Sequence, residues 1–225
     1  MNIESLEAIR KSIVETGMKL VHSSMTIGTY GNLSCRVDKS CIAITPSGKD
    51  YDTLVPEDIV VTNLEGSKLA GVLVPSSDLF LHLAIYNSFP EAQAIVHTHS
   101  IYASALAVAH KDLPPIVEDL TQIVGGAVRC TEYTISGTKE LGIKAVKAME
   151  GGHRAALLAN HGAVCWGRTL KEALYTARIL EKAAQIYCAA HALGATFTLD
   201  EKTAQELHDF YINHYSKRQR DEEHL

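Results

Sequence analysis

The sequence lacks any run of about 18 uninterrupted apolar residues, which is the minimum for a helix that crosses a membrane. Positive charge is also in short supply, because 21 Lys and Arg stand against 26 Asp and Glu, for a net charge of −5 at pH 7. Nucleic acids and anionic membranes are bound through an excess of Lys and Arg. We therefore expect neither a nucleic-acid partner nor a membrane partner.

Cysteine is scarce and shows no paired pattern. The five cysteines form an odd set without a C-x-x-C motif, which is typical of reduced thiols rather than of disulfides or thiolate zinc sites. The first residues also lack the basic and then apolar segments of a secretory signal. The expected location is the cytoplasm.

Proline is rare as well, with 6 residues in 225, while 46% of the residues are hydrophobic and 21% are charged. This is the composition of a folded protein, and no repeat or linker divides it. A chain of this length can bury roughly 70% of its unfolded surface in one core. We expect a single domain over residues 1–225, with its core at about 5–215 and a flexible tail at 216–225.

Segments whose apolar residues follow the helical period alternate along the chain with segments whose apolar residues recur at every second position. The alternating segments include hairpin pairs, which favour a mixed or antiparallel sheet. Strands are expected within 33–37, 41–45, 58–71, 92–100, 128–134 and 154–167. Helices are expected within 4–24, 74–89, 100–110, 138–150, 170–193 and 199–215, the second of them capped by Ser76 or Ser77.

Two histidines interrupt an apolar strand. His97 and His99 are separated by one residue, so the period of two directs both imidazoles to the same side. His161, at the end of another apolar strand, is a third candidate. An unpaired polar ring in such a strand costs a few kcal/mol, and three histidines with an open fourth position are a known catalytic zinc arrangement. The pattern predicts a metal site.

A carboxylate and a further histidine follow the sequence P-S-S at residues 75–77. Asp78 lies in the first turn of a predicted helix, where the helix dipole favours a negative charge, so a purely structural capping role is one interpretation. The other is a carboxylate beside the metal that moves a proton on the substrate. His82, one turn later, is expected to pack in the core or to support the site through a hydrogen bond.

Three loops rich in glycine and serine can offer hydrogen-bond donors to a phosphate. They are G-T-Y-G-N at 28–32, T-P-S-G at 45–48 and P-S-S at 75–77. Exposed backbone amides, hydroxyls and a helix N-terminus are the groups that bind phosphate. None of the loops matches a nucleotide-binding motif, so a nucleotide fold is not indicated.

The order and spacing of five short motifs resemble those of the class II aldolase/adducin family. The motifs are G-N-L-S (31–34), T-P-S-G (45–48), P-S-S-D (75–78), V-H-T-H-S (96–100) and L-A-N-H-G (158–162). The resemblance covers about residues 5 to 215. It implies an α/β fold of α/β/α type, with one domain around a mostly antiparallel sheet. It also implies a C4 homotetramer with active sites between subunits and one divalent metal per subunit, Zn²⁺ or Mn²⁺.

Carried over to this chain, the resemblance assigns roles to individual residues. The metal ligands would be His97, His99 and His161. The phosphate pocket would consist of Asn32, Ser47, Gly48, Ser76 and Ser77. Asp78 stands at the acidic catalytic position, and Asp119, or Glu118 with a shift of one residue, at the position that reaches a neighbouring subunit's site. Tyr211 or Tyr215 corresponds to the family's closing tyrosine.

The implied activity is metal-dependent cleavage of a ketose 1-phosphate to dihydroxyacetone phosphate and an aldehyde. Fuculose, 5-deoxyribulose and 5-methylthioribulose 1-phosphates are the expected substrate types. Asp78 and Asp119 are similar instead to the residues that an L-ribulose-5-phosphate 4-epimerase has at these two positions. Residues 130–141 and the chain length are similar to those of the aldolases. A non-catalytic adducin-like module is a third possibility, which the three histidines disfavour.

Overall fold

A seven-stranded sheet forms the middle layer of the computed structural model, which describes residues 3–215. Its strand order is β4-β3-β2-β1-β5-β7-β6, and every neighbouring pair is antiparallel. The strands are β1 (Asn32–Arg36), β2 (Cys41–Ile44), β3 (Val60–Asn63), β4 (Lys68–Ala70), β5 (Ala94–Thr98), β6 (Ala155–Leu158) and β7 (Gly162–Gly167). The prediction of an antiparallel sheet is confirmed. The tail predicted at 216–225 lies outside the described residues.

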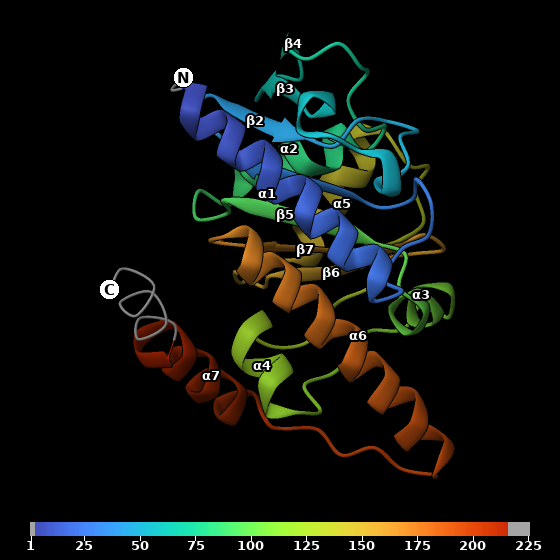
Figure 1. Cartoon of the computed structure of the whole chain (residues 1–225). Coiled ribbons are helices and arrows are strands. Elements are labelled where there is room, and N and C mark those ends of the chain that lie inside the picture. The colour runs from blue at the N-terminus through green and yellow to red at the C-terminus, as the bar shows by residue number, and fades with distance from the viewer. Residues whose placement is uncertain (1–2, 216–225) are drawn as a thin grey trace.

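Helices cover both faces of this sheet, which gives the predicted α/β/α layers (Figure 1). One face packs against α1, α3, α4 and α6, and the other against α2 and α5. The helices are α1 (Ile3–His22), α2 (Leu79–Ser88), α3 (Ile101–Val108), α4 (Glu118–Val124), α5 (Lys139–Ala148), α6 (Leu170–Ala192) and α7 (Glu201–Phe210). Within residues 3–215, none of them is long and apolar enough to cross a membrane.

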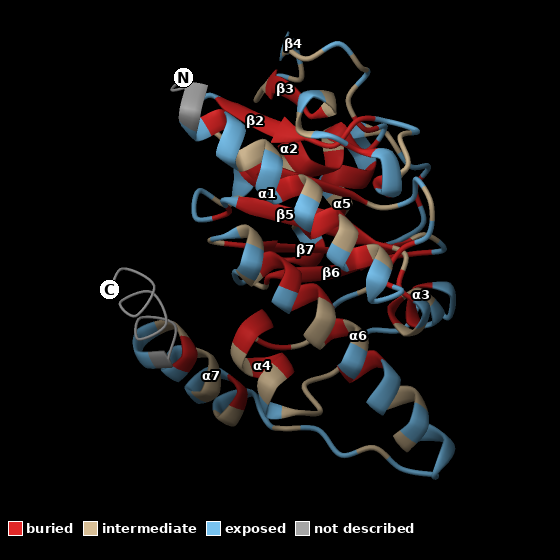
Figure 2. Cartoon of the chain, viewed as in Figure 1, coloured by how far each residue is buried: buried red, intermediate tan, exposed pale blue. Residues whose placement is uncertain are grey.

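The central strands are buried on both faces, as Figure 2 shows by their colour. In β5, Ala94 and Val96 join the core beneath α1 and α6, while Ile95 joins the core beneath α2 and α5. The period of two continues to His97, whose side chain therefore points to the α2 side of the sheet. Strand alternation thus decides which layer holds the candidate metal ligands.

The structure differs from the predicted elements at two places. Residues 128–134 form isolated bridges rather than a strand, one of them from Cys130 to Leu157. The Thr131 amide donates to the Leu157 carbonyl and the Leu157 amide to the Arg129 carbonyl, each at 2.9 Å, while the Cys130 amide donates to the Asp112 carboxylate at 2.7 Å. In addition, residues 118–124 form α4, a helix for which the sequence pattern gave no prediction.

A buried ion pair ties the start of β6 to α6. Arg154 is 2% exposed, and its Nη1 lies 2.7 Å from Glu172 Oε1. Arg168 Nη2 lies 2.6 Å from the same oxygen, and the Tyr211 hydroxyl donates to it at 3.2 Å. Burial raises the pKa of Glu172, but the hydrogen bonds from Arg168 and the charge of Arg154 outweigh it and lower that pKa from 4.5 to about 2.

Glu172→Gln is expected to lower the free energy of unfolding at pH 7 by about 3 kcal/mol, because it leaves the buried Arg154 charge without its partner. A depressed carboxyl pKa stabilises the fold above the unfolded value and ceases to do so as the pH falls. Wild-type protein should therefore lose stability between pH 4.5 and about 2, and the variant should lack this component. Urea unfolding measures both effects. Glu206→Gln, at an exposed ion pair with Lys202, is the matched control and should change stability by less than about 1 kcal/mol.

Candidate active site

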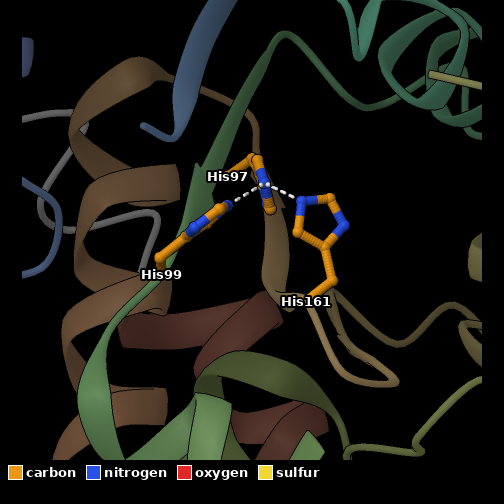
Figure 3. Close-up of side chains that lie close together, drawn as sticks. All are labelled: His97, His99 and His161. Carbon is orange, nitrogen blue, oxygen red and sulfur yellow. Dashed lines mark hydrogen bonds between the residues drawn. The ribbon is translucent and has the colours of Figure 1, made fainter. Parts of the chain in front are cut away.

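Three histidines meet at one end of the sheet (Figure 3). His97 lies in β5, His99 follows that strand, and His161 lies in the turn between β6 and β7. The Nε2 atom of His97 is 3.0 Å from Nε2 of His99 and 3.2 Å from Nε2 of His161. One ligand atom from each ring lies within 4.8 Å of the others. The structure thus brings together the three residues expected to bind metal.

The protonation of His97 suits metal binding. Its Nδ1 atom is 2.9 Å from the carbonyl oxygen of Ala163, which can only accept a hydrogen bond, so Nδ1 carries the proton. The Nε2 lone pair therefore faces the other two imidazoles. Burial, followed by the neighbouring imidazoles, lowers the pKa of His97 well below its ordinary value, and burial lowers that of His99 to about 4. Three neutral imidazoles that converge in this way fit a divalent cation.

The carboxylate of Asp78 faces the histidines. Its Oδ2 lies 3.7 Å from Nε2 of His97 and accepts a hydrogen bond from Asn32 Nδ2 at 2.9 Å. Its Oδ1 accepts from the backbone amide of Gly137 at 3.2 Å. Burial opposes the negative charge, but attraction from His97 and the hydrogen bond from Asn32 lower the pKa of Asp78. The group is therefore a carboxylate at neutral pH.

The helix that follows begins later than the sequence predicted. Asp78 itself occupies the N-cap position of α2, yet its side chain makes no capping hydrogen bond. The expected cap at Ser76 or Ser77 is wrong, because this segment pairs with the 45–47 loop: the Ser76 amide donates to the Thr45 carbonyl at 3.0 Å. The Ser76 hydroxyl instead accepts from the Asp78 amide at 3.2 Å. The capping interpretation of Asp78 does not describe its side chain.

A pocket of about 300 Å³ opens beside the histidines. The two serine-containing loops lie next to each other there, joined by a backbone bridge between Pro46 and Pro75. The pocket is lined by all five residues expected to bind phosphate, namely Asn32, Ser47, Gly48, Ser76 and Ser77, together with Asp78, His99 and His161. The backbone turn before Asn32 fits closely, because a Cβ on Gly31 would lie 2.7 Å from the His97 carbonyl oxygen. Hydroxyl and amide donors therefore share one pocket with the imidazoles and the carboxylate.

Five further residues line the pocket without an individually predicted role: Thr29, Tyr30, Gly31 and Pro46, which lie in the predicted phosphate loops, and Ser136. Ser136 comes from the loop before α5, where S-G-T repeats the small-residue pattern of the other loops and could have been noticed. Tyr30 belongs to the G-T-Y-G-N turn, and its ring centroid lies 5.5 Å from that of His99. Its aromatic side chain carries no pattern that marks it as a pocket residue.

Asp119, Glu118 and Tyr211 do not line this pocket. Asp119 lies at the start of α4, half-exposed, and forms an ion pair with Lys182 of α6; Glu118 is its neighbour on the same helix. Tyr211 is buried against Arg154 and Glu172. The side chain of Tyr215 is outside the described part of the structure.

Comparison with known proteins agrees with the motif pattern. Residues 11–188 match the model of the class II aldolase and adducin N-terminal domain. The chain belongs to this family. It is 38% identical over 203 residues to the 5-deoxy-D-ribulose 1-phosphate aldolase of Bacillus thuringiensis serovar kurstaki, which covers 90% of this chain and 94% of that protein. It is 30% identical over 204 residues to the L-fuculose phosphate aldolase of Escherichia coli, with the same shares of both chains covered.

The family fold is also found among solved structures. An L-fuculose 1-phosphate aldolase superposes with a TM-score of 0.87 at 36% identity, covering 91% of this chain and 96% of that one. Class II aldolases are lyases that depend on a divalent metal, and the three histidines of this family member form a cluster that can bind one.

Proposed function

We propose that this class II aldolase family member cleaves a ketose 1-phosphate to dihydroxyacetone phosphate and an aldehyde. The proposal rests on one pocket that combines two of three convergent imidazoles, those of His99 and His161 with His97 buried behind them, with a carboxylate and a set of hydroxyl and amide donors. The imidazoles of His97, His99 and His161 would hold a divalent cation, which when bound polarises the substrate oxygens as a Lewis acid. Zn²⁺ is the expected ion, and Mn²⁺ is the alternative.

The side chains of the pocket divide the remaining tasks. Ser47, Ser76 and Ser77, with the backbone at Gly48 and the amide of Asn32, would bind the phosphate and fix the sugar relative to the histidines. In cleavage the C4 hydroxyl gives up its proton, the C3–C4 bond breaks, and its electron pair stays on the C2–C3 fragment. A proton is then added to C3. Asp78, a carboxylate at neutral pH that lies 3.7 Å from His97, is suited to remove that proton in the aldol direction; in cleavage it must first take up a proton from solvent, which it then passes to C3.

The proton of the C4 hydroxyl needs a separate acceptor on the aldehyde side. Asp119 and a C-terminal tyrosine, Tyr211 or Tyr215, remain the candidates, each supplied by a neighbouring subunit in the expected C4 homotetramer. Asp119 is half-exposed and away from the chain's own pocket, so it can be presented to a neighbour. Tyr211 is buried against Arg154 and Glu172 and would have to leave these contacts to do the same. A tetramer would have four times the 24.5 kDa mass of the chain, which light scattering can measure.

The names of the relatives suggest which sugar phosphates to test. The Bacillus relative acts on 5-deoxyribulose 1-phosphate and the Escherichia relative on fuculose phosphate. We propose a substrate of this class for the present chain, and 5-methylthioribulose 1-phosphate belongs in the same set. The five cysteines are free thiols, which agrees with the predicted cytoplasmic location. The location itself stays a prediction.

A second candidate is a pentulose 5-phosphate 4-epimerase. The family resemblance favours it at two positions, because Asp78 and Asp119 stand where the epimerase has Asp and where fuculose-1-phosphate aldolase has Glu and Tyr. Such an enzyme breaks and remakes the same bond but releases no dihydroxyacetone phosphate. The test is a coupled assay for dihydroxyacetone phosphate on metal-loaded protein, with fuculose, 5-deoxyribulose and 5-methylthioribulose 1-phosphates beside ribulose 5-phosphate. Release from a ketose 1-phosphate supports the aldolase. Conversion of ribulose 5-phosphate to xylulose 5-phosphate without release would favour the epimerase instead.

Ser77→Asp tests the phosphate pocket. Ser77 is an exposed lining residue, and a carboxylate there would repel the substrate phosphate. At about 4 Å and an effective dielectric constant near 20, one pair of like charges costs roughly 4 kcal/mol, so kcat/KM should fall roughly 10²- to 10³-fold, mainly through KM. Ser67→Asp, an exposed serine in the turn between β3 and β4, is the control and should leave KM unchanged. An unaltered KM in Ser77→Asp would place the phosphate elsewhere.

A further inference from the structure

A buried chain of hydrogen bonds links the interior of the sheet to Asp78. His82 is fully buried, and its Nε2 lies 2.6 Å from Asn32 Oδ1, while its Nδ1 lies 2.6 Å from Ser34 Oγ. Ser34 Oγ lies 2.9 Å from the Tyr86 hydroxyl. Asn32 in turn donates to Asp78. Four consecutive hydrogen bonds therefore lead from Tyr86 to the carboxylate.

Two regular periods produce this alignment. On β1, Asn32 and Ser34 are two residues apart and share one face of the strand. On α2 and its N-cap, Asp78, His82 and Tyr86 recur every fourth residue and share one face of the helix. The strand face and the helix face are packed against each other, so the polar groups alternate between the two elements.

The direction of every donor is fixed. The Asp78 carboxylate can only accept, so Asn32 presents Nδ2 to it and Oδ1 to His82. His82 must then donate from Nε2, which leaves Nδ1 as the acceptor for the Ser34 hydroxyl. Because Ser34 has one proton, its oxygen accepts from the Tyr86 hydroxyl. All donors point towards Asp78, and such chains strengthen each member.

The surroundings keep His82 in this neutral form. Burial lowers the pKa of His82 to about 4, and attraction from Asp78 opposes that shift without overcoming it. At neutral pH the ring therefore has one proton, as the hydrogen-bond geometry requires. A charged ring would need an acceptor at Nδ1, where the Ser34 hydroxyl would then have to turn its proton away.

We propose that His82 is a positioning residue for the proton transfer at C3: it locks the Asn32 amide so that this amide holds the Asp78 carboxylate towards the histidines. The inference rests on the proposed function, because Asp78 is the group that moves the proton. Because the three serine hydroxyls and the Gly48 backbone are the other phosphate donors, it predicts that loss of His82 slows the proton step while the metal and most of the phosphate binding are retained. Outer contacts that orient a site residue are worth roughly 10- to 100-fold in activity.

The experiment follows exchange of the C3 hydrogen of dihydroxyacetone phosphate in D₂O by NMR, using Zn²⁺-loaded protein. His82→Leu should lower the exchange rate at saturating substrate roughly 10- to 100-fold, with KM within about twofold and unchanged metal content. His82→Gln keeps an amide N–H that can donate to Asn32, so it should recover most of that rate. A defect in general packing would not be repaired in this way.

Tyr86→Phe is the second variant, because it removes a single oxygen from the far end of the chain and disturbs the core less than His82→Leu. It should lower the exchange rate about two- to tenfold. Tyr51→Phe is its matched control, since it removes an equally buried hydroxyl on the opposite face of the sheet, and it should exchange like the wild type.

Three outcomes would contradict the proposed role of His82. Wild-type rates in both Tyr86→Phe and folded His82→Leu would overturn the role of His82. A loss confined to KM or to metal content would overturn it as well, because the effect would then lie in binding. If wild-type holoenzyme itself gave no exchange, the proposed function would fail first, and the role of His82 would fall with it.

Discussion

His97→Ala is expected to remove bound metal and activity together. Nε2 of His97 is the central atom of the cluster, 3.0 Å from the nitrogen of His99 and 3.2 Å from that of His161. The ring is fully buried and held by the Ala163 carbonyl, so its loss removes an oriented ligand from the centre of the cluster. A Lewis acid supplies several kcal/mol of transition-state stabilisation, so kcat/KM should fall roughly 10³-fold or more.

Metal analysis and the dihydroxyacetone phosphate assay on the same sample measure both losses. His22→Ala, which changes an exposed histidine at the end of α1, should retain the wild-type metal content and rate. Circular dichroism would verify that His97→Ala keeps its secondary structure. A folded His97→Ala protein with full activity would contradict the assignment of the three histidines as metal ligands.

Asp78→Asn is expected to lower kcat roughly 10²- to 10⁴-fold, the range that general acid–base groups contribute. The amide has nearly the shape of the carboxylate but cannot take a proton from C3. Because Asp78 Oδ2 lies 3.7 Å from His97 Nε2, outside the three-imidazole cluster, metal content should remain close to wild type. The exchange of the C3 hydrogen should fall by the same factor as kcat.

Asp52→Asn provides the control, because Asp52 is exposed and does not line the pocket. Its kinetics should match those of the wild type. If Asp78→Asn lost its metal in parallel with its activity, Asp78 would be a ligand in the resting enzyme. If it kept full exchange activity, another group would have to move the proton.

Much of the fold follows from local patterns. The hairpins at 33–45 and 58–71 were predictable because their apolar residues alternate and short turns separate them. The same period of two predicted that His97 and His99 would be close together, as they are. For His161, the strand on either side was predictable, but its distance from His97 depends on the register of β5 against β7. Family motifs supplied that long-range information.

Other features depend on contacts that no local pattern contains. The orientation of Asp78 is decided by the Gly137 amide and by Asn32, which lie 59 and 46 residues away in the chain. The segment 128–134 has the composition of a strand, but its pairing with β6 is limited to the isolated bridge from Cys130 to Leu157. In both cases long-range contacts outweigh the local preference.

The hydrogen-bond chain through His82 is an intermediate case. The signals were present, as N-x-S across the start of a predicted strand and D-x₃-H-x₃-Y within a predicted helix. Each is ordinary by itself. Only the packing of α2 on β1 shows that the two polar faces meet, and that His82 supports the site rather than the core alone.

The most direct test of metal-dependent cleavage by this protein is a metal titration of chelated protein, read out as dihydroxyacetone phosphate released from 5-deoxyribulose 1-phosphate. The metal-free protein should give no release. Activity should then rise in proportion to added Zn²⁺ and level off at one equivalent per chain, the capacity of one three-histidine centre. Full activity without metal, or no release at any metal loading from any of the ketose 1-phosphates, would contradict metal-dependent cleavage.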